Sequence, residues 1–251
     1  MKEIALAINE RVCIEFDYDG KRRIVEPHIV GANQKGHAVM RAYQVGGDST
    51  GALPAWRLFD LTKVSNIAIT KNTFEPRFAD GYKFNDLGIT MAAAAVSRME
   101  VYYALQDLES AKEKPSIFLA GPTPRDKKNV PTWRPEALMT LCRLGFEGAV
   151  FVPENSTWAA HDQYDEQIEW EWTGLDMATI VAFWVPRDIA TMPAFTTNVE
   201  FGMKAQSKKV VLGYPPNAPK MRYLHRLADR YGITVVHTME DTLKEAIRLC
   251  Q

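Results

Sequence analysis

Between Pro115 and the end of the chain, strand-like and helix-like segments alternate five times. Strands that are joined through helices pair in parallel, and such a sheet is covered by helices on both of its faces. The alternation therefore predicts an α/β domain over residues 115–251, built around a five-stranded parallel sheet. The strand-like segments are the apolar runs 116–122, 148–154, 179–186, 209–213 and 233–238, each followed by helical periodicity.

The same alternation predicts where a ligand binds. In open parallel sheets, ligands bind beyond the carboxyl ends of the strands. We therefore expect the functional site among the residues at these ends or their neighbours: Gly121, Pro153, Pro186 and Gly213.

Residues 1–86 have a different pattern. Short runs of alternating apolar residues are separated by turn residues such as Asp19-Gly20. About five short strands fit into this length, and a small curled sheet or barrel is the simplest way to hide their edges. The sequence predicts a β-rich domain over residues 1–86.

Residues 87–114 are rich in strong helix formers. Val101, Leu105 and Leu108 lie at helical spacing, so one face of such a helix would pack on a domain. We therefore expect a helical linker over residues 87–114.

The charge of the chain is nearly balanced, with 30 Lys plus Arg against 31 Asp plus Glu. Residues 1–86 carry 12 basic and 11 acidic side chains, so neither part has the surplus that grips duplex nucleic acid. The three cysteines lie far apart and the five histidines show no HxxxH or HxH spacing, so we expect no disulfides, metal or cofactor. No apolar run approaches the roughly 20 residues of a membrane span, which predicts a cytoplasmic protein without a membrane partner.

Glu200 is the sharpest catalytic candidate. The segment TTNVEFG, residues 196–202, follows the third strand of the α/β domain and opens a helix, which places Glu200 in the first turn. There the helix dipole and free backbone N–H groups favour an ionised carboxylate, as a charged nucleophile requires. Thr197-x-x-Glu200 is also a capping box, in which the glutamate only bonds back to the helix start, and on spacing alone this structural role is the commoner one.

The segment 162–178 is a predicted helix that combines carboxylates with Trp170 and Trp172. Acidic helices are usually solvated, but large aromatic side chains either pack in a core or stack on a ligand. We expect Trp172 to pack in the core and consider Trp170 as a ligand wall. Only part of the acidic set can face the strand ends, and the periodicity does not say which part: Asp165, Glu166, Glu169, Glu171 and Asp176.

The first strand of the α/β domain runs into a tight turn at Gly121, Pro122 and Thr123. Glycine permits close backbone approach, and the threonine places a hydroxyl at the strand end. Neither the GxGxxG dinucleotide fingerprint nor the GxxxxGK[ST] phosphate loop is present. Basic residues follow and could meet a phosphate, although such a run is more often a solvated loop: Arg125, Lys127 and Lys128.

In their order and spacing, FLAGP, the Trp- and Glu-rich helix, VAFWVP, TTNVEFG and VVLGYP resemble the nucleoside deoxyribosyltransferase family, in its divergent "like" branch, over about residues 115–240. The resemblance implies a flavodoxin-like fold with helices on both faces of the sheet. It also implies a glutamate that attacks the anomeric carbon of a nucleoside and forms a glycosyl-enzyme before a second base accepts the sugar. By position that glutamate is Glu200, and the carboxylate that handles the base is Glu171, with Asp176 as the fallback. The expected substrate-binding residues are Gly121, Pro122, Thr123, Trp133, Asp188 and Asn198.

Cleavage of an N-glycosidic bond passes through an oxocarbenium-like state, which needs one ionised carboxylate and one proton donor. The sequence departs from the family at two positions. Phe118 stands where many members have a tyrosine that orients the nucleophile, and Ala194 stands near the place of an aspartate, with Asp188 as a possible substitute. Water could then replace the second base as acceptor, which would make the protein an N-glycosidase.

The N-terminal stretch is similar to a WYL domain over about residues 8–80, through FDYDGKRRIVEPH, MRAYQVGG and PAWRLFDLTKV. The resemblance implies a small Sm-like or SH3-like β-barrel that senses a ligand or nucleic acid in other proteins. Simple filling of the barrel by Tyr43 and Trp56 is an equally good interpretation of those aromatic residues. The residues that fit the ligand-facing pattern are Arg41, Tyr43, Gln44, Trp56 and Arg57.

Three hypotheses follow. The leading one is a nucleoside 2-deoxyribosyltransferase-like glycosyltransferase or N-glycosidase that cleaves a (deoxy)nucleoside or nucleotide through Glu200, and the family analogy suggests a homo-oligomer. The alternative is a non-catalytic nucleotide sensor in which Glu200 only caps its helix. The third gives the WYL-like module a single-stranded nucleic-acid ligand, held by a local basic patch of Arg22, Arg23, Arg41 and Arg57.

Overall fold

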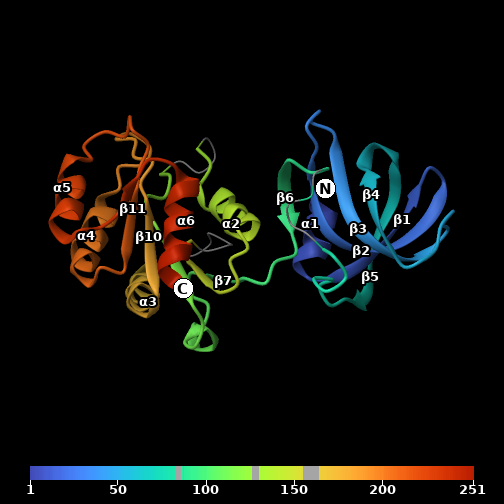
Figure 1. Ribbon diagram of the computed structural model, residues 1–251, viewed down its shortest axis with the longest axis horizontal. Coiled ribbons are helices and arrows are strands. Elements are labelled where there is room, and N and C mark those ends of the chain that lie inside the picture. Colours follow the sequence, from blue (N-terminus) through green and yellow to red (C-terminus); the bar gives the residue numbers. More distant parts are fainter. Residues whose placement is uncertain (83–85, 87, 126–129, 155–163) are drawn as a thin grey trace. The chain divides into compact units, whose positions relative to one another are not determined.

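The computed structural model describes the chain except for residues 83–85, 87, 126–129 and 155–163. The chain divides into two compact units, Met1–Ser97 and Arg98–Gln251 (Figure 1). No helix in the described part of the chain is both long enough and apolar enough to cross a membrane.

The first unit is a six-stranded antiparallel sheet with one helix. Its strands follow the order β4-β3-β2-β1-β5, and β6 also pairs with β2. Asp19 and Gly20 both have positive φ and join β1 to β2 in a two-residue turn, as the sequence predicts. The elements are α1 (Lys2–Asn9), β1 (Val12–Tyr18), β2 (Lys21–Ala32), β3 (Ala38–Gly47), β4 (Ala55–Asp60), β5 (Val64–Thr73) and β6 (Met91–Ala95).

The long strand β2 organises this unit because it pairs with three neighbours. β3 runs along most of its length, β1 pairs with its first half and β6 with its second half. Helix α1 buries Ile4, Ala7 and Ile8 against the sheet, which is the spacing of one helix face. The β-rich character of the unit is confirmed, but the pairings among the described residues end at β4 and β5 and do not close a barrel.

The prediction of a helix over residues 87–114 is wrong. This segment contains β6, the strand β7 (Glu100–Tyr103) and a short 3-10 turn at Glu109–Ala111. The alanine-rich run that favours a helix by propensity instead pairs with the free edge of β2, where Ile29 lies opposite Ala95. Tertiary pairing here overrides a weak local preference.

The second unit is a parallel α/β structure, as the alternation of segments predicts. Its sheet has six strands and not five, because β7 adds to the edge of β9; the order is β12-β11-β10-β8-β9-β7. The remaining elements are β8 (Ser116–Ala120), α2 (Arg134–Arg143), β9 (Ala149–Val152), α3 (Tyr164–Met177), β10 (Ile180–Trp184), α4 (Phe195–Lys204), β11 (Val210–Gly213), α5 (Arg222–Tyr231), β12 (Val235–Val236) and α6 (Met239–Cys250).

Helices cover both faces of this sheet (Figure 1). Ile117 and Leu119 of β8 pack in one core with residues of α2 and α6, whereas Phe118 packs in the other with residues of α3, α4 and α5. Alternate side chains of a strand point to opposite faces, so a strand buried on both faces has an apolar residue at every position. A ligand can therefore approach only at the ends of the strands.

Candidate active site

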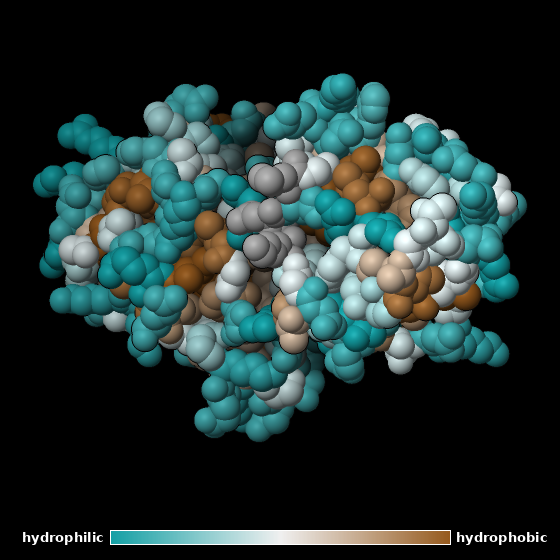
Figure 2. All heavy atoms as spheres, turned by 45° about the vertical axis from the view of Figure 1, so that its right-hand side comes forward, coloured by the Kyte–Doolittle hydropathy of each residue, from teal (hydrophilic) through white to brown (hydrophobic). Residues whose placement is uncertain are grey.

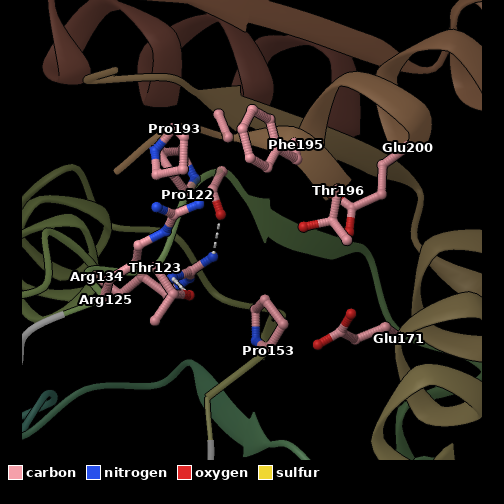
Figure 3. Close-up of a pocket in the computed structure, with 12 residues that line it drawn as sticks. Pro122, Thr123, Arg125, Arg134, Pro153, Glu171, Pro193, Phe195, Thr196 and Glu200 are labelled. Carbon is pink, nitrogen blue, oxygen red and sulfur yellow. Dashed lines mark hydrogen bonds between the residues drawn. The ribbon is translucent and has the colours of Figure 1, made fainter. Parts of the chain in front are cut away.

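A pocket of about 300 Å³ lies at the carboxyl ends of β8, β9 and β10, which agrees with the position that the strand alternation predicts. β8 and β10 are neighbours, but the chain leaves β8 toward α2 on one face and β10 toward α4 on the other. Such a switch point opens a crevice in an α/β sheet. The pocket is lined by Gly121, Pro122, Thr123, Arg125, Arg134, Pro153, Glu171, Pro193, Ala194, Phe195, Thr196 and Glu200 (Figure 3).

Glu200 projects into the pocket from the second turn of α4 (Figure 3). The helix begins at Phe195 after Ala194, which has a left-handed φ of 62°. Thr197 therefore lies inside the helix and is buried, so it is not a helix cap. The capping-box interpretation is wrong, since the helix starts earlier than the sequence signature indicates.

The electrostatics of Glu200 also differ from the expectation of a carboxylate held ionised by the helix dipole. Burial and the nearby Glu171 carboxylate raise the pKa of Glu200 to about 7, although Arg134 partly offsets the effect. No described residue donates a hydrogen bond to its carboxylate. At neutral pH this group exchanges its proton readily, as a group engaged in acid–base or nucleophilic chemistry requires.

Glu171 faces the same pocket from α3 (Figure 3). Burial raises the pKa of this carboxyl, while Gln167 and Arg134 act in the opposite direction. The Gln167 side-chain amide donates to Oε1 of Glu171 over 2.8 Å and fixes the orientation of the carboxyl group. The Glu171 charge raises the pKa of Glu200, so the two carboxyls interact and one can be ionised while the other is protonated.

Arg134, at the start of α2, is the buried cation of the pocket, and only 1% of its surface is exposed. One NH1 group bonds to Glu154 over 2.5 Å and to the Thr123 hydroxyl over 3.0 Å. The other guanidinium N–H groups donate to the carbonyls of Leu119 and Gly121 over 3.1 and 2.7 Å. A buried guanidinium needs this many partners to offset its desolvation, so Arg134 locks the turn after β8.

Gly121 is required at that turn. Its φ is +151°, and a Cβ atom there would lie 2.1 Å from the Trp184 carbonyl oxygen and 2.8 Å from the Trp133 ring. The Trp133 indole N–H in turn donates to the Pro122 carbonyl over 3.0 Å. The backbone thus approaches β10 closely enough to form the wall of the pocket.

Residues 114–218 match the model of a family described as "Nucleoside 2-deoxyribosyltransferase like". The C-terminal unit contains a nucleoside 2-deoxyribosyltransferase-like domain. No curated protein matches the chain. Among solved structures the chain is similar to proteasome accessory factor B/C (PafBC) of Arthrobacter aurescens, with 22% identity over 30% of this chain and 12% of that chain. The TM-score of 0.26 is too low to establish a shared fold.

Four predicted site residues of the deoxyribosyltransferase-like domain do not line the pocket. Asp176 is exposed on α3 and forms an ion pair with Lys204 over 2.9 Å. Trp133 supports the pocket from behind the Gly121 turn. Asp188 accepts bonds from Ala190 and Thr191 within its own loop, and Asn198 accepts one from Arg187.

Of the four residues predicted at the strand ends, two line the pocket and two do not. Gly121 and Pro153 line the pocket, whereas Pro186 and Gly213 do not. Gly213 instead allows close packing, since a Cβ atom there would lie 1.9 Å from the Thr242 hydroxyl. Of the basic run after the turn, Arg125 lines the pocket, and Lys127 and Lys128 fall outside the described residues.

The two tryptophans of α3 take the opposite positions from those expected. Trp170 is buried next to Phe118, with its indole N–H bonded to the Gln106 carbonyl over 2.7 Å, and Trp172 is 49% exposed. The other carboxylates of the predicted acidic set are exposed: Asp165, Glu166 and Glu169. Glu171 is therefore the member of this set that reaches the pocket.

Sequence reasoning missed the pair of Arg134 and Glu154. Both are nearly fully buried. Arg134 begins α2, and Glu154 lies in the turn after β9. No local spacing links them. A charged residue directly after a buried strand, as Glu154 is, is the one signal that could have drawn attention to the pair.

In the first unit, the proposed ligand-facing residues serve several internal contacts. Tyr43 and Trp56 face each other across β3 and β4 at 5.1 Å, and the Trp56 indole N–H donates to the Asp80 carbonyl over 2.7 Å. Gln44 is buried and donates to the carbonyls of Gly46 and Asp48.

Two of the four arginines of the basic patch in this unit form ion pairs. Arg41 makes a two-point ion pair with Asp86, with distances of 2.5 and 3.0 Å, and Arg22 pairs with Glu15. Arg57 is half-buried and takes part in none of the ion pairs among the described residues. With two of its four arginines paired, the patch offers little free charge to a nucleic-acid backbone.

Proposed function

We propose that the deoxyribosyltransferase-like domain cleaves the N-glycosidic bond of a (deoxy)nucleoside or nucleotide, with Glu200 as nucleophile and Glu171 as proton donor. The single observation that carries the proposal is that two carboxyl groups with raised pKa values, from neighbouring helices, line one pocket at the strand ends. The match to the family model supports the same assignment.

The chemistry balances with these two groups alone. In the reactive form of the pocket Glu200 is ionised and the proton lies on Glu171, and a pKa of about 7 leaves part of Glu200 ionised at neutral pH. The Glu200 carboxylate bonds to the anomeric carbon as the bond from that carbon to the base nitrogen breaks, and the departing nitrogen takes the proton of Glu171. In the second step, water or another base attacks the anomeric carbon. Its proton passes to Glu171, and Glu200 leaves as a carboxylate, so the sugar keeps its configuration.

The aspartate that many family members carry shortly before the nucleophile has no counterpart in the pocket. Ala194 lies in the wall of the pocket, and the Asp188 carboxylate accepts hydrogen bonds from residues of its own loop. Phe118 is buried against Trp170, and unlike a tyrosine it has no hydroxyl to orient the nucleophile. These positions favour water as the sugar acceptor, with transfer to a second base as the other outcome.

The assignment of the folds belongs to the same proposal. The strand order β9-β8-β10-β11-β12 corresponds to the flavodoxin-like order 2-1-3-4-5, with β7 as an added edge strand. For the first unit we propose a WYL-like module that binds a small ligand. The exposed parts of Tyr43, Trp56 and Arg57 are the candidate contacts.

Incubation with a panel of deoxynucleosides and deoxynucleotides, with and without free bases, tests the proposal. Free base released without an acceptor indicates a hydrolase, and exchange of bases indicates a transferase. We expect Glu200→Gln and Glu171→Gln each to lower kcat at least ~100-fold, because each removes a group that acts in the transition state. Glu169→Gln, on the exposed face of the same helix as Glu171, is the matched control and keeps full activity.

If the unmodified protein binds nucleotides tightly without turning them over, the result would contradict the proposed enzymatic activity and support the hypothesis of a non-catalytic sensor. A folded Glu200→Gln variant with unchanged kcat would remove Glu200 as nucleophile. Near-ultraviolet circular dichroism of each variant verifies that the tertiary packing is intact.

A further inference from the structure

Arg125 places a second positive charge on the wall of the pocket. Its backbone N–H donates to the Thr191 carbonyl over 2.9 Å, which anchors it beside the loop before α4. Its guanidinium lies over the ring of Phe195, 5.5 Å from the ring centre. An aromatic face holds a guanidinium by a cation–π contact and leaves its N–H donors free.

The two arginines of the pocket differ in what they bind. The Arg134 guanidinium is buried and occupied by Glu154 and three other oxygen atoms. Arg125 is exposed and takes part in none of the ion pairs among the described residues. Within that part of the chain, Arg125 is the pocket cation whose charge has no carboxylate partner.

The pocket is also polarised along its length. Figure 3 draws Arg125 with Pro122 and Pro193 at one end and Glu171 and Glu200 at the other. The first turn of α4 borders the pocket through Phe195 and Thr196, and backbone N–H groups of a first helical turn have no partner within the helix. A ligand that fits this wall has an anionic group at the end away from the reacting carbon.

We propose that the substrate is a phosphorylated nucleoside, a (deoxy)nucleoside 5′-monophosphate, whose phosphate binds Arg125 while its anomeric carbon faces Glu200. This inference rests on the proposed function, because it names the substrate class of the same site. The 5′-phosphate is separated from the anomeric carbon by the width of the sugar, which keeps its charge away from the two carboxylates. Arg125 then supplies the charge-assisted hydrogen bonds that distinguish a nucleotide from a nucleoside.

The test compares a deoxynucleoside with its 5′-monophosphate as substrates of the unmodified protein, Arg125→Ala and Arg125→Lys. The readout is the ratio of kcat/KM for the monophosphate to kcat/KM for the nucleoside. We expect a ratio well above one for the unmodified protein. Loss of a hydrogen-bonded charge pair lowers this ratio by about 10- to 100-fold in Arg125→Ala, and Arg125→Lys restores part of it.

Arg222→Ala is the matched control, since Arg222 is an exposed arginine at the start of α5 that does not line the pocket. It should leave the ratio unchanged. A ratio near one in the unmodified protein, or an unchanged ratio in Arg125→Ala, would overturn the phosphate assignment and leave the proposed glycosidic cleavage standing.

Calorimetric binding separates the two proposals when no compound is cleaved. In that case the proposed function fails, and weaker binding of the monophosphate by Arg125→Ala than by the unmodified protein still supports the phosphate site. Inorganic phosphate is titrated as a third ligand. Inorganic phosphate could bind as tightly as the monophosphate and lose this binding in Arg125→Ala. That result would identify a site for free phosphate and overturn the assignment of a nucleotide substrate.

Discussion

Glu171, Glu200 and Arg134 form one electrostatic unit although they come from three different helices. Arg134 favours the ionised form of both carboxyls, and burial opposes it. Because Arg134 is already paired with Glu154, its charge only partly offsets the burial of the other two groups. Glu200 therefore keeps a proton up to about pH 7, well above the pH at which a glutamate in water releases it.

This raised pKa has a consequence for stability. Between the usual value of 4.5 and about 7, folded Glu200 keeps a proton that the unfolded chain has released, so its contribution to stability falls as the pH rises and levels off above about 7. We expect the Glu200→Gln variant not to lose this contribution to stability as the pH rises, because glutamine does not titrate. Relative to the unmodified protein, the variant should gain about 2 kcal/mol of unfolding free energy between pH 5 and pH 8, measured by urea unfolding.

The buried His28 also makes the stability depend on pH, but in the opposite direction to Glu200. Burial lowers the pKa of His28 to about 4, so its contribution to stability is lost as the pH falls from about 6.5 toward 4. This titration is the same in both proteins and cancels in the comparison. Equal pH dependence of the variant and the unmodified protein would contradict the raised pKa of Glu200.

At the scale of elements, α4 has two apolar faces. Its inner face packs on the sheet through Phe201, while Phe195, Val199 and Met203 form an exposed stripe at intervals of four residues, each at least 60% exposed. Residues spaced by four lie on the same side of a helix. The stripe begins at Phe195, which also lines the pocket, so a partner bound there would border the pocket.

We expect this stripe to mediate self-association of the chain. Val199→Lys places a charge in the stripe and should shift the protein toward a monomer in sedimentation velocity experiments, with a rise in KM of a few-fold because the pocket rim loses its cover. Tyr223→Lys on α5, where the tyrosine is 78% exposed, is the control and should leave the assembly unchanged. A monomeric unmodified protein would refute the expectation.

At the scale of the whole molecule, the boundary between the two units follows Ser97 rather than the expected end of a linker at residue 114. Residues 98–114 belong to the C-terminal unit because β7 extends its sheet. The backbone N–H of Ala104 donates to the Glu154 carbonyl over 3.2 Å, and the Gln106 carbonyl accepts from Trp170 over 2.7 Å. This segment thus supports both the Arg134 partner and the helix that carries Glu171.

Two truncated proteins test this boundary. We expect a fragment of residues 98–251 to fold cooperatively, and a fragment of residues 115–251 to be less stable by about 3 kcal/mol or more, because it loses β7 and the burial of Leu108. Thermal unfolding followed by circular dichroism measures the difference. Equal stability of the two fragments would place the boundary at residue 115 after all.

Most of the face in Figure 2 is hydrophilic, and apolar side chains gather there in separate patches. This agrees with the nearly equal numbers of basic and acidic residues. A nearly balanced charge produces no strong net field, so the proposed function depends on where a few charges are placed in the pocket.

The sequence by itself determined the parallel α/β unit, the position of the pocket at the strand ends and the candidate Glu200. These features follow from local patterns: apolar runs of strand length, helical periodicity and residues that directly follow strands. The β-rich character of the first unit follows from the same kind of signal.

Only the tertiary structure decided the pairing of β6 and β7, the raised pKa of Glu200 and the choice of Glu171 among the carboxylates of α3. Strand pairing depends on which edge is free elsewhere in the fold, and a pKa depends on burial and on charges brought from distant segments. Arg134 interacts with both glutamates from a helix far away in the sequence. No local spacing contains that information.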